Sequence, residues 1–346
     1  RRAARAQNHH TMGRSKGRST GSTRLPLGVT GGERTNPRVR IMGNNTMNQE
    51  RVHNAAEQHG YSTVRVLEHT GSTNDDARQV LTDPNPSVRE QLGELSVFAT
   101  DDQRAGHGRL DRAWVTPPGT ALAATVVVRP HAGIGQGMAP ENYHWLTLIM
   151  GLSVREVLRE LGVDCDLKWP NDLIAGGKKC CGVLAQLILE PAGTNPAGTA
   201  ATSMSVLVGA GINLNMLEEQ LPTETATSTR VLLGHTVDTE QVLTHLLEVF
   251  ARRYRAFCSA GGDPESPGGG EPSLLQQARE HTLTLGAHVA MHLPDGRVIT
   301  GTAEDIDDQG RILVRSDGAL TAYSVGDIEH LRAADGSYLA TRPPQA

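Results

Sequence analysis

The sequence predicts an α+β protein with a central domain of interleaved strands and helices and a small β-domain at its C-terminal end. Two observations lead to this class. Strand-like and helix-like runs follow one another up to about residue 258, and after residue 287 only short alternating runs separated by turn residues remain. With 346 residues, of which 38% are hydrophobic, the chain is long enough for two folded domains, which excludes a wholly disordered protein.

The first elements are expected between residues 64 and 128. Residues 64–68 alternate apolar and polar side chains, as an edge strand does. Residues 95–100 and 121–128 are predicted strands, the second of them buried. Between the first two strands, Ser72 followed by acidic residues marks the start of a helix. Residues 101–114 carry no apolar periodicity and are predicted to form a loop.

The rest of the central domain is predicted to span two long helices and two long strands. The helices cover residues 143–161 and 238 to about 257, the strands cover 181–189 and 206–212, and sharp turns lie at 170–172 and 176–177. The helical runs carry apolar residues at helical spacing, and Gly162 suits the C-terminus of the first. Residues 191–203, rich in Gly, Pro, Ala and Thr, are interpreted as a hairpin tip.

The composition of residues 259–273 is that of a linker between the two domains. A short helix is expected over 274–280. Four short strands follow, over 288–293, 298–306, 311–315 and 320–324, with turn residues such as Pro-Asp-Gly between them. Strands of this length and spacing indicate a small closed barrel. The predicted domains are therefore 47–258 and 274–346.

The charge is distributed unevenly along the chain. Residues 1–40 hold nine arginines and Lys16 against one acid, Glu33, so their net charge is +9, whereas the whole chain has −5. Because this stretch has no apolar periodicity, a disordered basic tail is predicted over 1–46, with Met47 as a natural start. Weak nucleic-acid binding and an upstream extension are both open interpretations of the tail, and the second is favoured.

Several classes of protein are excluded by composition. Aromatic residues make up 3% of the chain, too few for a stacking platform that binds single-stranded nucleic acid. The sequence has no apolar run long enough for a membrane-spanning helix and no secretory signal pattern at its start. The four cysteines form no Cys-x-x-Cys pair, which argues against a zinc site or disulfide framework and favours the cytoplasm.

Four segments carry residues suited to chemistry. Ser72, Thr73 and Asn74 stand at a helix start, where they could simply cap the helix or bind a polar ligand group. In the 101–114 loop, glycines allow close backbone approach, and Arg109 and Arg112 suit phosphate or carboxylate. The sequence contains neither a P-loop nor a Rossmann fingerprint, so nucleotide binding of either kind is excluded.

The third segment, Lys-Trp-Pro-Asn-Asp over 168–172 with Lys-Lys-Cys-Cys-Gly over 178–182, brings an acid, an amide and lysines into one hairpin. Such a mixture suits a polyanion bound with Mg²⁺, although a structural Trp-Pro turn is the simpler alternative. The fourth segment, residues 209–215, ends a strand in small residues and asparagines. It is interpreted either as a bulge or as a floor for a flat ligand.

Taken together and in this order, the segments resemble the catalytic domain of biotin–protein ligases. That family shows S-T-N, a G-R-G-R-x-x-R-x-W loop, K-W-P-N-D-[LI], K-[KR]-x-x-G-[IV]-L and G-x-G-[IL]-N. The resemblance spans roughly residues 62–333 and implies a mixed sheet with helices, similar to class II synthetases, plus an SH3-like C-terminal barrel. The sequence departs from the family pattern at His107, where the family has arginine, and at Asp111, where it has glycine.

The resemblance implies a role for each residue. The catalytic residues would be Lys179, Arg109 and Asp172, and Asp172 would also bind Mg²⁺. The residues expected at biotin are Ser72, Thr73, Asn74, Gln103, Gly106, His107, Gly108, Arg109, Trp114, Lys179 and Gly209. The residues expected at ATP are Arg109, Arg112, Lys168, Asn171, Lys179, Ile212 and Asn213. Because adjacent strand residues point to opposite faces, only one of Lys178 and Lys179 can enter the site, and the family spacing selects Lys179.

The implied activity is ATP-dependent biotinylation of a lysine on a biotin carboxyl carrier domain, through biotinyl-5′-AMP. The closest alternative is a lipoate or octanoate–protein ligase of the same fold. A biotin-sensing DNA-binding repressor is a further alternative, but residues 1–60 show no convincing helix-turn-helix, so no specific DNA binding is expected. Biotin, ATP and Mg²⁺ are the expected small molecules, and no membrane partner is expected.

Overall fold

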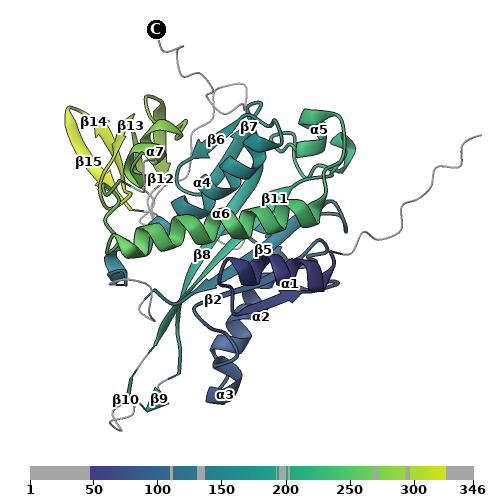
Figure 1. Cartoon of the computed structure of the whole chain (residues 1–346). Coiled ribbons are helices and arrows are strands. Elements are labelled where there is room, and N and C mark those ends of the chain that lie inside the picture. Colours follow the sequence, from purple (N-terminus) through teal and green to yellow (C-terminus); the bar gives the residue numbers. More distant parts are fainter. Residues whose placement is uncertain are drawn as a thin grey trace, which may run out of the picture. The chain divides into compact units, whose positions relative to one another are not determined.

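The computed structural model describes residues 47–109, 112–130, 137–191, 193–194, 200–201, 203–267, 272–292 and 297–324. Its central element is a seven-stranded sheet in the order β1-β2-β5-β11-β8-β7-β6 (Figure 1). The strands are β1 Thr63–Val66, β2 Leu95–Thr100, β5 Ala121–Val128, β6 Cys165–Lys168, β7 Asp172–Ala175, β8 Lys178–Leu189 and β11 Met204–Asn213. β1 runs parallel to β2, and the other pairs are antiparallel. The predicted α+β class with a central mixed sheet is confirmed.

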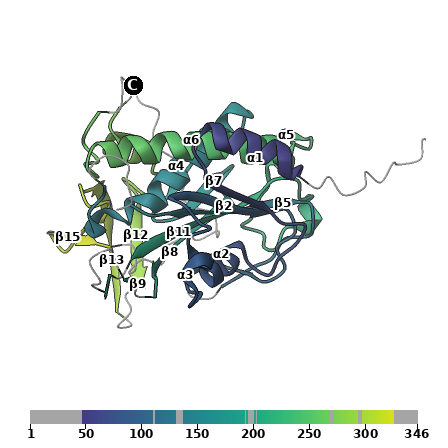
Figure 2. The same ribbon diagram turned by 60° about the horizontal axis from the view of Figure 1, so that its bottom comes forward.

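Helices cover both faces of this sheet (Figure 2). α1 (Gln49–Gln58), α4 (Trp145–Glu160) and α6 (Thr239–Ser259) lie on one face, and α2 (Thr73–Leu81) lies with α3 (Pro86–Arg89) on the other. All eight residues of β5, an inner strand, are buried, as expected for a strand covered on both sides. None of the described helices is long and apolar enough to cross a membrane.

Short elements complete the central domain. They are β3 Gly106–His107, β4 Ala113–Trp114, β9 Gly193–Thr194, β10 Ala200–Ala201, α5 Thr229–Leu233 and the 3₁₀ turns Pro140–Asn142 and Glu218–Gln220. β3 and β4 pair with each other, so the segment predicted as a plain loop contains a small hairpin. Asp111, the second departure from the family pattern, lies outside the described residues.

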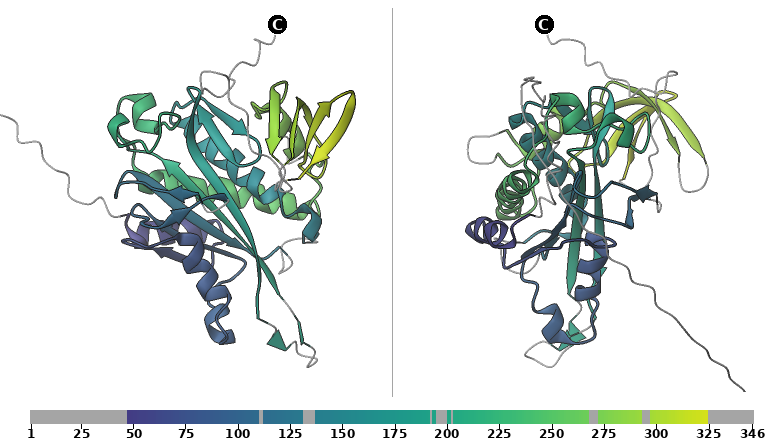
Figure 3. Two further views of the ribbon diagram at one scale, coloured as in Figure 1. Left: turned by 180° about the vertical axis from the view of Figure 1, so that it is seen from behind. Right: turned by 90° about the vertical axis from the view of Figure 1, so that its right-hand side faces the viewer.

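The C-terminal part consists of α7 (Leu274–Glu280) and a four-stranded antiparallel sheet (Figure 3). Its strands are β12 His288–His292, β13 Val298–Ile306, β14 Ile312–Ser316 and β15 Ala319–Tyr323. Each lies within one residue of its predicted position. These four strands form an open meander in sequence order, and the end of the predicted barrel domain, 325–346, lies outside the described residues.

Two indole groups of the central domain donate hydrogen bonds to one turn of the C-terminal sheet. Nε1 of Trp145 donates to the carbonyl of Asp308 (2.9 Å), and Nε1 of Trp169 donates to the carbonyl of Gly310 (3.0 Å). Gly310 has φ +71°, and a Cβ there would lie 2.9 Å from the ring of His144. The β13–β14 turn therefore approaches the central domain as closely as its backbone allows.

The structure differs from the sequence-based expectations at three places. The sequence patterns do not predict α1, which Asn48 caps and which buries only Val52 and Ala56 among its ten residues. β8 begins at Lys178 rather than at residue 181, because Lys178 pairs with Ala175 of β7. The range predicted as a linker starts inside α6, and backbone hydrogen bonds hold residues 262 and 264. The predicted basic tail, 1–46, lies outside the described residues.

Candidate functional site

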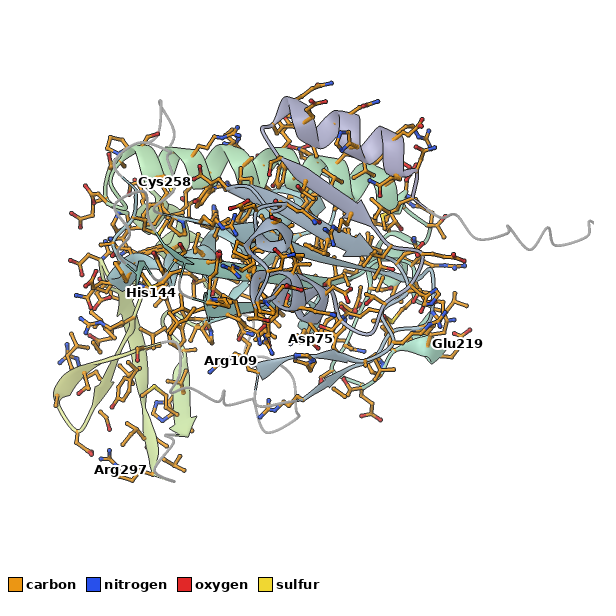
Figure 4. All side chains as sticks on the ribbon, turned by 90° about the horizontal axis from the view of Figure 1, so that it is seen from below. Asp75, Arg109, His144, Glu219, Cys258 and Arg297 are labelled. Carbon is orange, nitrogen blue, oxygen red and sulfur yellow. The ribbon has the colours of Figure 1, made fainter. Side chains whose placement is uncertain are left out.

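A cavity of about 460 Å³ lies at one end of the central sheet and gathers almost all of the predicted site residues. Arg109, from the loop between β3 and β4, and Asp75, on α2, are labelled in Figure 4. The predicted residues that line the cavity are Ser72, Thr73, Asn74, Gln103, His107, Gly108, Arg109, Arg112, Trp114, Lys168, Asn171, Asp172, Lys179, Gly209 and Asn213.

Four strands build the floor of the cavity from one row of paired residues. Ala123 on β5 pairs with Gly211 on β11, Gly211 pairs with Gly182 on β8, and Gly182 pairs with Asp172 on β7. Residues paired directly across antiparallel strands share a face of the sheet, so an alanine methyl group, two glycines and one carboxylate lie side by side. The row is suited to a flat ligand that ends at a charged group.

The indole of Trp114 lies on this floor. A Cβ at Gly211 would stand 2.6 Å from Cε2 of Trp114, and one at Gly182 would stand 3.3 Å from its Cζ3. The ammonium of Lys179 lies 5.5 Å from the centre of the same ring, within the range of a cation–π contact. Glycine is therefore required at 211 to let the ring approach the sheet.

The next row of paired residues along the sheet is covered by the side chain of Asn74 and is not open to the cavity in the same way. Thr125, Gly209 and Leu184 are paired across β5, β11 and β8. A Cβ at Gly209 would lie 2.3 Å from Oδ1 of Asn74, so the amide covers this glycine. Gly209, predicted to lie beneath biotin, lines the cavity but lies directly beneath Asn74.

Hydrogen bonds fix the corner formed by the start of α2. Oγ of Ser72 accepts from the backbone N–H of Asp75, which makes Ser72 the helix cap, and both Ser72 and Thr73 are buried. Oε1 of Gln103 accepts from the backbone N–H of Thr73 (3.0 Å) and from its hydroxyl (3.3 Å). Ser72 thus caps α2 and, together with Thr73, also lines a polar corner of the cavity.

Lys179 and Asp172 form an ion pair at the charged end of the floor, with Nζ 2.6 Å from Oδ1. A β-bulge explains how Lys179 reaches the cavity. Lys179 pairs with Ile174 and Cys181 with Leu173, so Cys180 is the extra residue on β8. Without the bulge, Lys179 and Gly182 would point to opposite faces, and with it both line the cavity.

The backbone of Lys179 is also held from the other side of β8. Its N–H donates to the carbonyl of Thr225, and its carbonyl accepts from the N–H of Thr227. Lys178, its neighbour, is not among the described lining residues. Of these two lysines, Lys179 is the one that lines the cavity.

Polar side chains line the rest of the charged end. Nδ2 of Asn171 donates to the carbonyl of Val183 (2.9 Å), which leaves Oδ1 to accept from Arg109 (3.4 Å). Nδ2 of Asn213 donates to the carbonyl of Thr227, whereas its buried Oδ1 has no partner among the described residues. Lys168 and Arg112 also line this end, so the described residues of the lining include four cationic side chains and one carboxylate, that of Asp172.

His107, the departure from the family loop, lies beside the start of α2. Its Nε2 is 3.8 Å from Oδ1 of Asp75, and its side chain is 25% exposed. The position that usually carries arginine therefore contacts a carboxylate instead of projecting into solvent.

Two predicted residues lie away from the cavity lining. Gly106 is buried against Gln103 and the carbonyl of Trp114, and a Cβ there would clash with both. The side chain of Ile212 is packed in the core, because it alternates with Gly211 and Asn213 along β11. Ile212 can therefore meet a ligand only through its backbone.

Sequence reasoning missed three contributors to the site. Thr125 and Gln186 hydrogen-bond to Asn74, and part of the wall, here called the 222–226 wall, is formed by Pro222, Thr223, Thr225 and Ala226. Thr125 was hidden in a strand of small and β-branched residues, where only its hydroxyl distinguishes it. The 222–226 wall carries no motif, and its contact with Lys179 depends on the tertiary fold.

The two cysteines of β8, Cys180 and Cys181, are fully buried. A hydrogen bond with Cys165 and burial raise the pKa of the Cys180 thiol, and burial raises that of Cys181. Thiols held in the protonated form are poor nucleophiles and poor metal ligands. Both side chains therefore serve packing beneath the cavity.

With cationic side chains gathered around a carboxylate at one end of the cavity, the described site is of the kind found in enzymes that act on anionic substrates. Two family models match the chain: the biotin/lipoate A/B protein ligase family over residues 82–195, and the biotin protein ligase C-terminal domain over residues 284–331.

Curated relatives cover most of the chain. The biotin–[acetyl-CoA-carboxylase] ligase of Paracoccus denitrificans is 30% identical over 267 residues, 72% of this chain and 93% of the relative. That of Mycobacterium tuberculosis is 29% identical over 280 residues, 79% and 91% of the two chains. The chain belongs to the biotin protein ligase family.

A solved structure has the same fold. The biotin protein ligase of Aquifex aeolicus, determined in complex with biotin and ATP, superposes with a TM-score of 0.59. The two chains are 23% identical, and the superposition covers 77% of this chain and 98% of the other.

Proposed function

We propose that this protein attaches biotin to a lysine of a biotin carboxyl carrier domain, through a biotinyl-5′-AMP intermediate. The observation that carries the proposal is one cavity with a neutral hydrogen-bonding corner at one end and Lys179, Arg109 and Asp172 at the other. A ligand with a polar neutral ring and a carboxylate tail fits that polarity. Membership of the biotin protein ligase family supports the same substrate.

In the first step, the carboxylate of biotin attacks the α-phosphate of ATP, and pyrophosphate leaves. Two anions must approach each other, so cations have to offset their repulsion. Lys179 contacts both reacting groups in this proposal, Arg109 holds the phosphate and carboxylate side, and Arg112 reaches the polyphosphate. The buried Oδ1 of Asn213, which has no partner among the described residues, is an acceptor for an N–H of the nucleotide base.

The residues present fit a Mg²⁺ ion bound together with ATP. Oδ1 of Asp172 is buried, and its described contact is the ion pair with Lys179 rather than a well-aligned hydrogen bond. Mg²⁺ in nucleotide sites is commonly held by one or two carboxylates plus substrate phosphates, so one carboxylate is enough. Bound there, Mg²⁺ would neutralise phosphate charge.

In the second step, the amine of the acceptor lysine attacks the acyl carbon of the mixed anhydride. The new amide forms, AMP leaves with the bonding electron pair, and the amine loses a proton. Asp172 is the described carboxylate in the cavity and is therefore our candidate for accepting that proton. Since the four cysteines are free and buried, we also place the protein in the cytoplasm.

The test is ATP–pyrophosphate exchange with biotin and lipoate side by side, followed by transfer to a purified biotin carboxyl carrier domain. We expect exchange to depend on biotin, and the acceptor lysine to gain the mass of one biotinyl group. Exchange that depends on lipoate and not on biotin would contradict the proposed substrate and favour the lipoate ligase alternative.

A further inference from the structure

A fully buried hydroxyl lies beneath the neutral corner of the cavity, outside the residues that touch it. Thr125 is in the middle of β5, paired with Gly209 and Phe98. Its Oγ1 lies 2.7 Å from Oγ1 of Thr73 and 2.6 Å from Oδ1 of Asn74. Both of those residues line the cavity, whereas Thr125 does not appear among the lining residues.

The orientation of the Asn74 amide is fixed by its other contacts. Its Nδ2 faces the carbonyl of Leu184 (3.4 Å) and Oε1 of Gln186 (3.0 Å). A backbone carbonyl can only accept, so the nitrogen must be on that side and Oδ1 must face Thr125. This oxygen needs a donor, and the hydroxyl of Thr125 is the one within reach.

The hydroxyl protons of this corner are few. Thr125 has one proton, but two oxygens lie within 2.7 Å of it. Thr73 also has one proton for two acceptors, Oε1 of Gln103 at 3.3 Å and Oγ1 of Thr125 at 2.7 Å. The shorter contact needs that proton, because Thr125 gives its own to Asn74. With its proton directed at Thr125, Oγ1 of Thr73 has a remaining lone pair to offer in the cavity wall.

A buried hydroxyl oxygen that offers a lone pair in the cavity wall favours a ligand that brings N–H donors, because an unpaired buried acceptor is costly. A cyclic urea carries two N–H groups on its ring, whereas a dithiolane ring carries none. We propose that Thr125 is a positioning residue that sets this polarity and thereby selects the ureido ring of biotin over the dithiolane ring of lipoate. The inference rests on the proposed function, and it adds the residue that decides the specificity.

The test compares Thr125→Val, which keeps the shape and removes the hydroxyl, with Thr125→Ser, which keeps the hydroxyl. In biotin-dependent ATP–pyrophosphate exchange, Thr125→Val should raise the KM for biotin about 10- to 100-fold, the scale of one buried acceptor left without its partner. kcat and the KM for ATP should stay within about 3-fold, and Thr125→Ser should behave as wild type. Desthiobiotin retains the cyclic urea, so Thr125→Val should raise its KM by the same factor as the KM for biotin.

Ser153→Ala serves as the matched control, because it removes a buried hydroxyl that donates only to the carbonyl of Ile149 within α4. It should leave every kinetic constant unchanged. If Thr125→Val does not fold, Thr125→Ala removes the same proton without adding a methyl group near the network.

Two outcomes would overturn the inference, and a third concerns the proposed function. One is an unchanged KM for biotin in Thr125→Val. The other is a fall in kcat together with equal rises in the KM values for biotin and for ATP. Either result would show that Thr125 only packs the core. Wild-type exchange driven by lipoate and not by biotin would instead overturn the proposed function.

Discussion

The ammonium of Lys179 lies 2.6 Å from the carboxylate of Asp172, at the charged end of a floor otherwise made of small residues. Asp172 thus holds, before any ligand binds, the cation that must meet the substrate carboxylate and the α-phosphate. Both side chains are largely buried, with 29% and 16% of their surface exposed, so water screens the pair only in part. The position of the lysine is set by the bulge in β8 and by this carboxylate together.

The first prediction concerns Lys179 and its neighbour. Lys179→Ala should slow adenylation by ~10²- to 10³-fold, the effect of losing one preorganised donor to a developing negative charge. Lys178→Ala is the control, because Lys178 is outside the described lining of the cavity, and it should be mild. ATP–pyrophosphate exchange measures both, and a more severe loss in Lys178→Ala would contradict the assignment.

The class of fold and most of its longer elements could be predicted from the sequence, because residues 95–100 and 121–128, for example, show their strand character locally. The helix α1 and the order of the strands in the sheet could not, because no local pattern specifies them. The site could be predicted only where short motifs carry its residues. Thr125 and the 222–226 wall meet the motif residues through pairing and folding over long sequence distances, which no local pattern records. Asn74 lying over Gly209 is likewise a tertiary contact.

The second prediction concerns the floor. Gly211→Ala would place a Cβ 2.6 Å from the indole of Trp114, so the ring and any flat ligand on the floor must move away from the sheet. The KM for biotin should rise roughly 10-fold, because small misplacements of a bound group are costly. Gly71→Ala is the control, since its Cβ meets nothing closer than 3.9 Å. Equal KM values in the two variants would show that the floor does not carry the ligand.

The third prediction uses the two indoles that hold the C-terminal turn. Trp145→Phe and Trp169→Phe each leave one carbonyl of that turn unpaired, which should cost about 1–3 kcal/mol of unfolding free energy. Only Trp169 is next to Lys168 in the chain and close to Asn171 and Asp172, so only Trp169→Phe should raise the KM for ATP. Thermal unfolding and exchange kinetics separate these effects. A similar rise in Trp145→Phe would mean that general destabilisation, rather than Trp169, changes ATP binding.

The fourth prediction concerns His107. Its contact with Asp75 is long, at 3.8 Å, and partly exposed, so it fixes the loop only weakly. His107→Arg would supply a permanent charge and a reach suited to the same carboxylate. We expect biotinyl-AMP to dissociate about 2- to 5-fold more slowly, since exposed ion pairs contribute ~0.2–1 kcal/mol. Measured in an Asp75→Asn background, the gain should disappear, and a gain that persists there would point to a contact with the phosphate instead.

The last prediction concerns acid stability at the contact between the central domain and the C-terminal turn. His144 lies against Gly310, and its buried Nε2 has no hydrogen-bond partner among the described residues. Burial lowers the pKa of His144 below its usual value of 6.5, and Arg311 acts in the same direction, whereas Asp307 and the carbonyl of Glu141 oppose the shift. The folded protein therefore favours the neutral ring.

The sign of the pH dependence follows from this shift. Because the unfolded chain takes up the proton at a higher pH than the folded one, stability is fully present above about pH 6.5 and is lost as the pH falls through the lowered pKa. His144→Gln, which stays neutral, should lose less melting temperature between pH 7.5 and 5 than wild type. Burial also lowers the pKa of His281. His281→Gln is therefore the comparison variant, and it shows how much of the pH dependence of the melting temperature comes from His281. Parallel melting curves for wild type and His144→Gln would mean that His144 does not titrate on unfolding.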